Sequence, residues 1–122
     1  MIQALIVDDE PTHIQGLIRH VRWEALGYAP PLSADSGEAA LETIQRRAVD
    51  VLITDVSMPV MTGIELVSRC KALGYRLQVL MISGYNEFEF VQEAIHVGAQ
   101  GYVLKPIKTE EVEAKLEAFR AA

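Results

Sequence analysis

The sequence contains a single cysteine, no long apolar run and no cluster of basic residues. Because Cys70 has no second cysteine to pair with, an internal disulfide is excluded, which is typical of chains that work in a reducing compartment. No stretch approaches the roughly 20 apolar residues of a membrane-spanning helix, and the first residues lack the basic segment of a secretory signal. We therefore expect a soluble, cytoplasmic protein without a membrane partner.

Basic side chains are also in the minority. The chain has 11 lysines and arginines against 17 aspartates and glutamates, which gives a formal net charge of −6. Nucleic-acid surfaces need clustered lysine and arginine for their phosphate contacts, so the sequence disfavours direct nucleic-acid binding by this chain. Half of the 122 residues are hydrophobic, and no repeat or linker divides them. We expect residues 1–122 to form a single domain.

The sequence does have short apolar runs that end at polar residues. Four are clear: residues 5–7 before Asp8, 51–54 before Asp55, 79–82 before Ser83 and 102–104 before Lys105. Runs of this length are typical of parallel strands buried on both faces, and the carboxyl ends of such strands meet at one edge of the sheet, where ligands bind. A weaker run at 29–34 contains two prolines, which cannot donate a ladder hydrogen bond, so we expect it at the sheet edge.

Helical patterns separate these runs. In the first, Ile14, Leu17, Ile18 and Val21 follow the spacing of one buried stripe, and Thr12 is the expected N-cap.

The later helices have predicted ends of their own. The second should begin after Asp35, with Glu38 reaching back in a capping box. The third should run over residues 64–73 and end near Gly74, and the fourth should follow Asn86 and end near Gly98; a last helix is expected over residues 109–120. Five βα units with right-handed crossovers predict an α/β fold, a doubly wound five-stranded parallel sheet with five helices in a three-layer sandwich.

Three carboxylates, those of Asp8, Asp9 and Asp55, are predicted to share a pocket at the edge of this sheet. Like charges so close together need a cation, and hard oxygen ligands favour Mg²⁺, with Mn²⁺ as the alternative. Taken alone, the acidic triplet after the first run could simply favour the start of a helix. Asp55 has no such role, because Pro59 and Gly63 delay the next helix.

The chemistry of this set is that of phosphoryl transfer. An aspartate that attacks phosphorus needs charge neutralised on the transferring oxygens, and Mg²⁺ with a lysine does so. Lys105 supplies the ammonium group and Ser83 a hydroxyl donor. We therefore predict that Asp55 is a phosphoryl acceptor, and that its acyl phosphate is a transient state.

Five motifs in fixed order resemble the receiver domains of bacterial two-component response regulators. They are Val7-Asp8-Asp9-Glu10, Asp55-Val56-Ser57-Met58-Pro59, Gly63, Ser83-Gly84 and Lys105-Pro106, and they span almost the whole chain. The resemblance implies a flavodoxin-like strand order of 2-1-3-4-5. It also implies a signalling switch that accepts phosphoryl from a sensor histidine kinase, rather than an enzyme acting on other substrates.

The resemblance assigns further roles to these residues. It implies that Asp9 binds Mg²⁺ directly beside Asp55 and the backbone carbonyl of Ser57, whereas Asp8 acts mainly through a bound water. Ser83 would swing towards the phosphoryl group of Asp55, and Lys105 would pair with that group.

Two expectations concern the rest of this edge. Tyr102 matches the family's aromatic residue that turns inward on activation, although it could simply be an amphipathic residue at the sheet edge. The Lys105–Pro106 peptide is expected to be cis. Phosphorylation would then change the surface of the fourth helix, fifth strand and fifth helix, which could form a homodimer.

Residues 22–28, together with residues 83–88, resemble receivers joined to AraC-type helix-turn-helix output domains. Trp23 lies in the first of these segments and is either a marker of that subfamily or a core aromatic. If it is a marker, the chain is a fragment of a longer regulator that controls transcription through an output domain absent from this sequence.

Other readings remain open at this point. The chain could be a stand-alone receiver or a phosphorelay shuttle, or an interaction module that works without phosphate. A Mg²⁺-dependent phosphohydrolase of the haloacid dehalogenase kind also uses an aspartate nucleophile, but its Asp-x-Asp pattern has serine here, at Ser57. His13, His20 and His96 are predicted to be surface residues without a carboxylate partner at ligand spacing.

Overall fold

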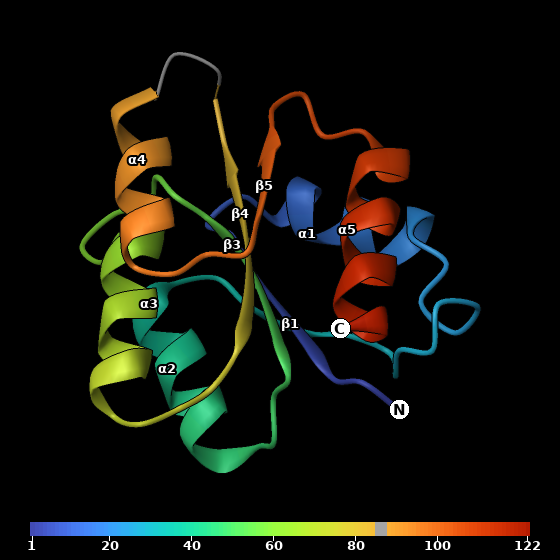
Figure 1. The fold of residues 1–122 in the computed structure, drawn as a ribbon, viewed down its shortest axis with the longest axis horizontal. Coiled ribbons are helices and arrows are strands. Elements are labelled where there is room, and N and C mark those ends of the chain that lie inside the picture. Colours follow the sequence, from blue (N-terminus) through green and yellow to red (C-terminus); the bar gives the residue numbers. More distant parts are fainter. Residues whose placement is uncertain (85–87) are drawn as a thin grey trace.

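The computed structural model describes residues 1–84 and 88–122, in which strands and helices alternate (Figure 1). The strands are β1 (Ala4–Val7), β2 (Leu32–Ala34), β3 (Val51–Asp55), β4 (Gln78–Ser83) and β5 (Gly101–Leu104). The helices are α1 (Pro11–His20), α2 (Gly37–Arg46), α3 (Gly63–Ala72), α4 (Phe88–His96) and α5 (Thr109–Ala121). The predicted helix start after Asn86 and part of the AraC-like segment, residues 85–87, lie outside the described residues.

The described strands form one parallel sheet in the order β2-β1-β3-β4-β5. This confirms the predicted doubly wound fold and its strand order. The short strand β2 lies at the edge, directly after the two prolines, as their missing N–H groups require.

The pairing register brings the polar strand ends together. Val7 of β1 pairs with Thr54 of β3, so that the residue after Val7 lies beside Asp55. Asp55 in turn pairs with Ile82, and Ser83 pairs with Leu104. The ends of β1, β3 and β4 are therefore each offset by one residue from the next, whereas the ends of β4 and β5 lie side by side. The predicted site residues gather at this carboxyl edge of the sheet.

Helices cover both faces of the sheet, with α1 and α5 on one side and α2, α3 and α4 on the other (Figure 1). Successive strand residues point to opposite faces. Leu5 and Val7 therefore join the core under α2 and α3, whereas Ala4 and Ile6 join the core under α1 and α5. Burial of the strands on both faces explains why they appear in the sequence as continuous apolar runs.

The helix starts differ slightly from the predictions. Ser36, not Asp35, is the N-cap of α2, and its side chain accepts a hydrogen bond from the Ala39 backbone N–H at 3.1 Å. Glu10, not Thr12, precedes α1, because Pro11 occupies the first helical position, where a missing N–H costs nothing. These changes move each start by one or two residues and leave the helices in place.

The helix ends follow the predicted glycines. Gly74 and Gly98 have φ of +87° and +97°, the left-handed conformation that glycine adopts most easily after a helix. The longest helix described, α5, has 13 residues. No helix in the described part of the chain has the length and apolar character needed to cross a membrane.

Candidate functional site

Asp55 is the centre of the site at the carboxyl edge of the sheet. Its side chain is 3% exposed, at the end of the fully buried strand β3. Its Oδ2 accepts a hydrogen bond from Lys105 Nζ at 3.0 Å, and its Oδ1 accepts one from the Ser57 backbone N–H at 3.2 Å. Lys105 follows β5, and the Lys105–Pro106 peptide is cis, as predicted. A buried carboxylate is thus held between an ammonium group and a backbone donor.

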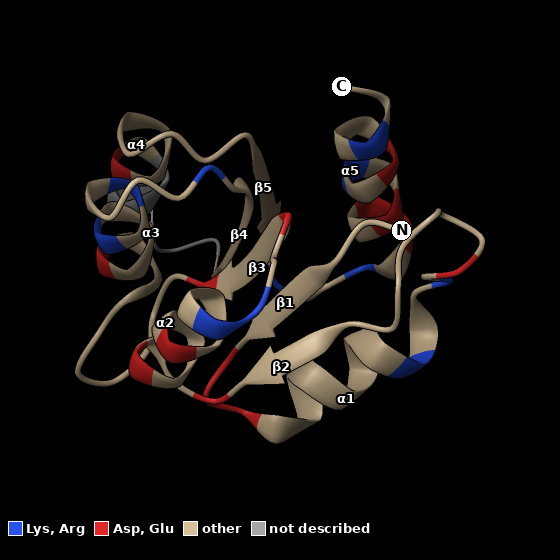
Figure 2. Cartoon of the chain, turned by 90° about the horizontal axis from the view of Figure 1, so that it is seen from below, with Lys and Arg blue, Asp and Glu red and all other residues tan. Residues whose placement is uncertain are grey.

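Asp8 lies next to Asp55 and is equally buried. Its Oδ1 accepts a hydrogen bond from the Glu10 backbone N–H at 2.9 Å, which fixes the turn between β1 and α1. Figure 2 shows this acidic stretch as it runs from β1 into α1. Burial raises the pKa of Asp8, and the neighbouring charge of Asp55 adds to the increase. Two carboxylates in one buried pocket disfavour each other's charge, and a cation would relieve this.

His13 is the site residue that the sequence analysis missed. Its Nδ1 lies 3.0 Å from Asp8 Oδ2, and its Nε2 lies 3.4 Å from Glu10 Oε2. The prediction that His13 has no carboxylate partner was therefore wrong. The signal was present in the sequence, since a helix that begins at Pro11 carries residue 13 in its first turn, beside the end of β1. His20 and His96 are exposed, as predicted.

The residues present fit a divalent cation. Among the described residues, Asp8, His13 and Asp55 each offer one ligand atom, and these atoms lie within 4.8 Å of one another. Buried carboxylate oxygens are the donors that Mg²⁺ and Mn²⁺ prefer. Asp9 is exposed and does not belong to this group of atoms. Its predicted role as a direct ligand remains a prediction.

Ser83 and Tyr102 form a pair beside the acidic pocket. Ser83 is fully buried at the end of β4, and its Oγ shares a hydrogen bond with the Tyr102 hydroxyl across the β4–β5 pair. Tyr102 is partly buried and packs against the core under α2 and α3. The hydroxyl groups of Ser83 and Tyr102 are therefore linked directly to each other.

The loop between β3 and α3 is shaped by two unusual positions. Val60 has φ of +68° and is 87% exposed, a conformation that a β-branched residue rarely adopts. Gly63 begins α3 so close to β3 that an added Cβ would lie 2.2 Å from the Asp55 carbonyl oxygen. Only glycine allows this approach, which holds the backbone of Asp55 in place. Val60 gave no signal in the sequence, because its conformation is a property of the loop.

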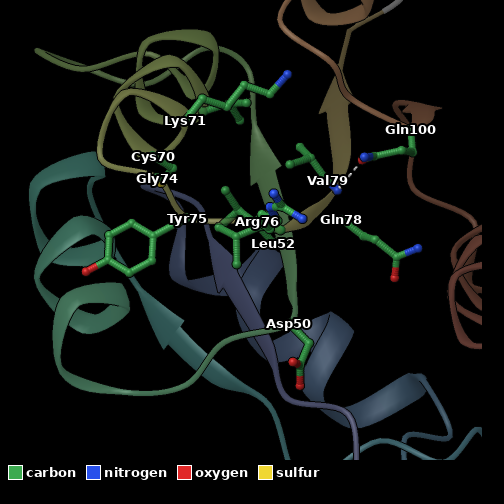
Figure 3. Close-up of a pocket in the computed structure, with 12 residues that line it drawn as sticks. Asp50, Leu52, Cys70, Lys71, Gly74, Tyr75, Arg76, Gln78, Val79 and Gln100 are labelled. Atoms are coloured by element: carbon green, nitrogen blue, oxygen red, sulfur yellow. Dashed lines mark hydrogen bonds between the residues drawn. The ribbon is translucent and has the colours of Figure 1, made fainter.

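A separate cavity lies at the opposite, amino end of the sheet. It has a volume of about 700 Å³ and lies between Asp50, Cys70, Lys71 and Arg76 (Figure 3). Burial raises the pKa of the Cys70 thiol, which favours a packing role over a redox role. Figure 3 also shows Gln100 accepting a hydrogen bond from the Val79 backbone N–H, at 2.7 Å.

Comparison with known proteins supports the geometry. The family model "Response regulator receiver domain" matches residues 4–117. The "uncharacterized transcriptional regulatory protein YesN" of Bacillus subtilis (strain 168) is 35% identical over 121 residues, which cover 99% of this chain and 33% of YesN. The transcriptional regulatory protein ZraR of Escherichia coli O157:H7 is 37% identical over 95% of this chain and 26% of its own length. The chain thus spans a third or less of these two relatives.

Solved structures agree with this match. A two component transcriptional regulator AraC from Clostridium phytofermentans ISDg is 37% identical, with a TM-score of 0.91 over 99% of this chain and 94% of that chain. The REC domain of AraT, a response regulator from Geobacillus stearothermophilus, is 34% identical, with a TM-score of 0.87 over 98% and 95% of the two chains. The family model matches this chain along nearly its whole length, and Asp55 lies beside Asp8 and pairs with Lys105 at the edge of the sheet. This chain therefore belongs to the family of response regulator receiver domains.

Proposed function

We propose that this chain is a phosphorylation-controlled switch in which Asp55 accepts a phosphoryl group from a sensor histidine kinase. The observation that carries the proposal is the buried Asp55 carboxylate, paired with Lys105 Nζ at 3.0 Å beside Asp8. A carboxylate oxygen of Asp55 attacks phosphorus, the bond from phosphorus to the kinase's histidine nitrogen breaks, and an acyl phosphate forms. No general base is needed, because the attacking oxygen carries no proton.

The side chains around Asp55 each have a role in this transfer. Lys105 moves its ion pair from the carboxylate to a phosphoryl oxygen and neutralises part of the charge. Asp8, Asp9, Asp55 and the backbone carbonyl of Ser57 would hold Mg²⁺ or Mn²⁺, which when bound supplies further positive charge to the transferring oxygens. Burial of Asp55 excludes competing water from the reacting carboxylate.

The response to phosphorylation is proposed to run through Ser83 and Tyr102. A phosphoryl oxygen offers the Ser83 hydroxyl a stronger acceptor than the Tyr102 hydroxyl that it now contacts. Release of Tyr102 then shifts the balance between two arrangements of the surface formed by α4, β5 and α5. This surface includes the exposed Leu104 of β5 and is the proposed site of homodimer formation.

The proposed output of the switch is control of transcription. YesN and ZraR are named as transcriptional regulatory proteins, and this chain covers 33% and 26% of their lengths. We propose that the receiver acts through an output domain of the AraC type, as the similarity to the Clostridium phytofermentans regulator suggests. Beyond accepting and slowly losing its own phosphoryl group, the receiver catalyses no turnover.

Intact mass measurement tests the proposal. The wild type, Asp55→Asn and Asp35→Asn are each incubated with Mg²⁺ and acetyl phosphate; Asp35 is the matched control, an exposed aspartate just beyond the end of β2. We expect one phosphoryl adduct in the wild type and in Asp35→Asn, and none in Asp55→Asn. An adduct that persists in Asp55→Asn would place the acceptor elsewhere, and no adduct in any folded variant would favour a phosphate-independent interaction module.

A further inference from the structure

We propose that His13 is a nitrogen ligand of this acidic site and that it makes the site bind Ni²⁺, Co²⁺ or Zn²⁺ much more tightly than its carboxylates alone would. The inference rests on the proposed function for the metal site itself and adds the choice of metal. It is carried by the position of His13: one of its ring nitrogens lies within 4.8 Å of carboxylate oxygens of both Asp8 and Asp55, and its Nδ1 lies 3.0 Å from Asp8 Oδ2.

The spread of these atoms suits direct coordination. Two ligand atoms about 2.1 Å from a small divalent cation are about 3.0 Å apart when at right angles and about 4.2 Å apart when on opposite sides. The three atoms of Asp8, His13 and Asp55, which lie within 4.8 Å of one another, would therefore move inward to bind one ion. The side chain of His13 is 30% exposed, so the imidazole has room to move and an ion can reach it from solvent.

The orientation of the imidazole fits the same role. Its Nε2 faces the Glu10 carboxylate at 3.4 Å, while its Nδ1 faces Asp8 at 3.0 Å. A metal-bound histidine usually donates its other ring N–H to a carboxylate, which fixes the ring and raises its basicity. Glu10 would serve in this way, and Nδ1 would exchange its contact with Asp8 for a bond to a metal that Asp8 also binds.

The ligand atoms determine which metal ions His13 would bind more tightly. Mg²⁺ is a hard ion that takes oxygen ligands and keeps several waters, so an imidazole adds little to its binding. Imidazole suits Zn²⁺, Ni²⁺ and similar ions, whose affinity for mixed nitrogen and oxygen sites is higher. If His13 is only an ion-pair partner of Asp8, its removal should not distinguish between the two kinds of metal.

Calorimetric titration of untagged protein with NiCl₂ and, separately, with MgCl₂ tests this difference. His13→Gln removes the imidazole, and His20→Gln is the matched control, an exposed histidine on the same helix. We expect His13→Gln to weaken Ni²⁺ binding by at least about tenfold, the usual cost of disturbing a ligand or its support. Its Mg²⁺ affinity should stay unchanged, and His20→Gln should keep both affinities.

A second measurement reports on the ring itself. Nitrogen NMR of the imidazole side chains during a Zn²⁺ titration should move the Nδ1 resonance of His13 and leave His20 unaffected. Equal losses of Ni²⁺ and Mg²⁺ affinity in His13→Gln, or an unchanged Ni²⁺ affinity, would overturn the inference.

Mg²⁺-dependent labelling by acetyl phosphate, measured on the same samples, separates this inference from the proposed function. A phosphoryl adduct without His13-dependent Ni²⁺ binding overturns only the metal preference. Ni²⁺ binding through His13 without any adduct overturns only the phosphoryl switch.

Discussion

The two faces of the sheet are held together in different ways. Under α1 and α5, two buried side chains donate hydrogen bonds to backbone carbonyls. The Tyr28 hydroxyl donates to the distant Leu116 carbonyl of α5 at 2.7 Å, and the Trp23 indole N–H donates to the Leu17 carbonyl of α1 at 3.1 Å. At the surface of the same side, Arg22 forms two side-chain hydrogen bonds with Glu113 and lowers its pKa.

Under α2, α3 and α4, the core contains several closely packed methionines. Met58, Met61 and Met81 are buried in this core, and Met61 lies so close to Gly37 that a Cβ there would be 2.7 Å from its sulfur. Methionine is flexible and adapts to changes in its surroundings. The comparison suggests that the core under α1 and α5 is a fixed support for Asp8. The core under α2, α3 and α4, against which Tyr102 packs, is then the one that can rearrange.

The largest effect should follow from removing Trp23. Its ring is 7% exposed and packs edge-on against Tyr28, with ring centroids 5.9 Å apart. Trp23→Ala should lower the free energy of unfolding by about 3–5 kcal/mol, because it leaves a large cavity in the core under α1 and α5. Urea denaturation measures the loss, and Trp23→Phe, which keeps a ring, should lose clearly less. A loss below about 1 kcal/mol would mean that Trp23 is not part of this core.

On the other side of the sheet, at the start of α3, Gly63→Ala should lower the free energy of unfolding by about 2–3 kcal/mol, because the new methyl group would press against the Asp55 carbonyl. It should also slow labelling of Asp55 by acetyl phosphate, since the acceptor's backbone must move. Gly16→Ala is the matched control, as nothing lies within 4 Å of its Cβ position in α1. There the same change should stabilise the protein slightly. Equal effects at the two glycines would contradict the close approach.

Tyr28, in the core under α1 and α5, makes the stability of the fold depend on pH. Burial raises the pKa of its hydroxyl to about 12, so the folded state holds the proton more tightly than the unfolded state, whose value is 10.0. The stability from this group is complete below pH 10 and is lost as the pH rises towards 12.

Tyr28→Phe should therefore cost about 1–1.5 kcal/mol at neutral pH and flatten the alkaline part of the stability curve. Thermal melts between neutral and alkaline pH measure both effects. Tyr75→Phe, a partly buried tyrosine at the other core, is the control. The same alkaline decline in wild type and Tyr28→Phe would assign it to another group.

The smallest effect should be a gain. Val60→Gly removes a side chain that disfavours φ of +68° and should stabilise the protein by about 1 kcal/mol or less. Val60→Ala keeps the Cβ atom and should bring little of this gain. Urea denaturation of both variants separates backbone strain from the exposure of an apolar side chain. A gain of the same size in both would assign the effect to exposure.

The sequence predicted the fold well because the strand interiors carry an unambiguous signal. Fully buried parallel strands must be apolar at every position, and their ends could be read from the polar residues that follow, as with Asp55 and Lys105. Helix starts were harder, because Asp35 and Ser36 are equally good capping residues. Their choice depends on where β2 ends, and this is a tertiary property.

The site was predictable as a set of residues but not as a set of contacts. Alternating burial and register place Asp8 beside Asp55, whereas the contact of His13 with Asp8 depends on α1 beginning at Pro11 rather than after Thr12. Side-chain direction depends on how α1 leaves the sheet. The sequence motif therefore identifies the candidate site residues, and the packing of α1 determines which of them contact one another.

The position of Lys105 after the last strand also has a consequence for synthesis. Asp8, Asp55 and Ser83 leave the ribosome well before β5, and Lys105 follows that last strand. Domains fold as units once their parts are available. A nascent chain therefore lacks the ammonium partner of Asp55 until β5 has been made, and the Asp55–Lys105 ion pair forms only when the sheet is complete.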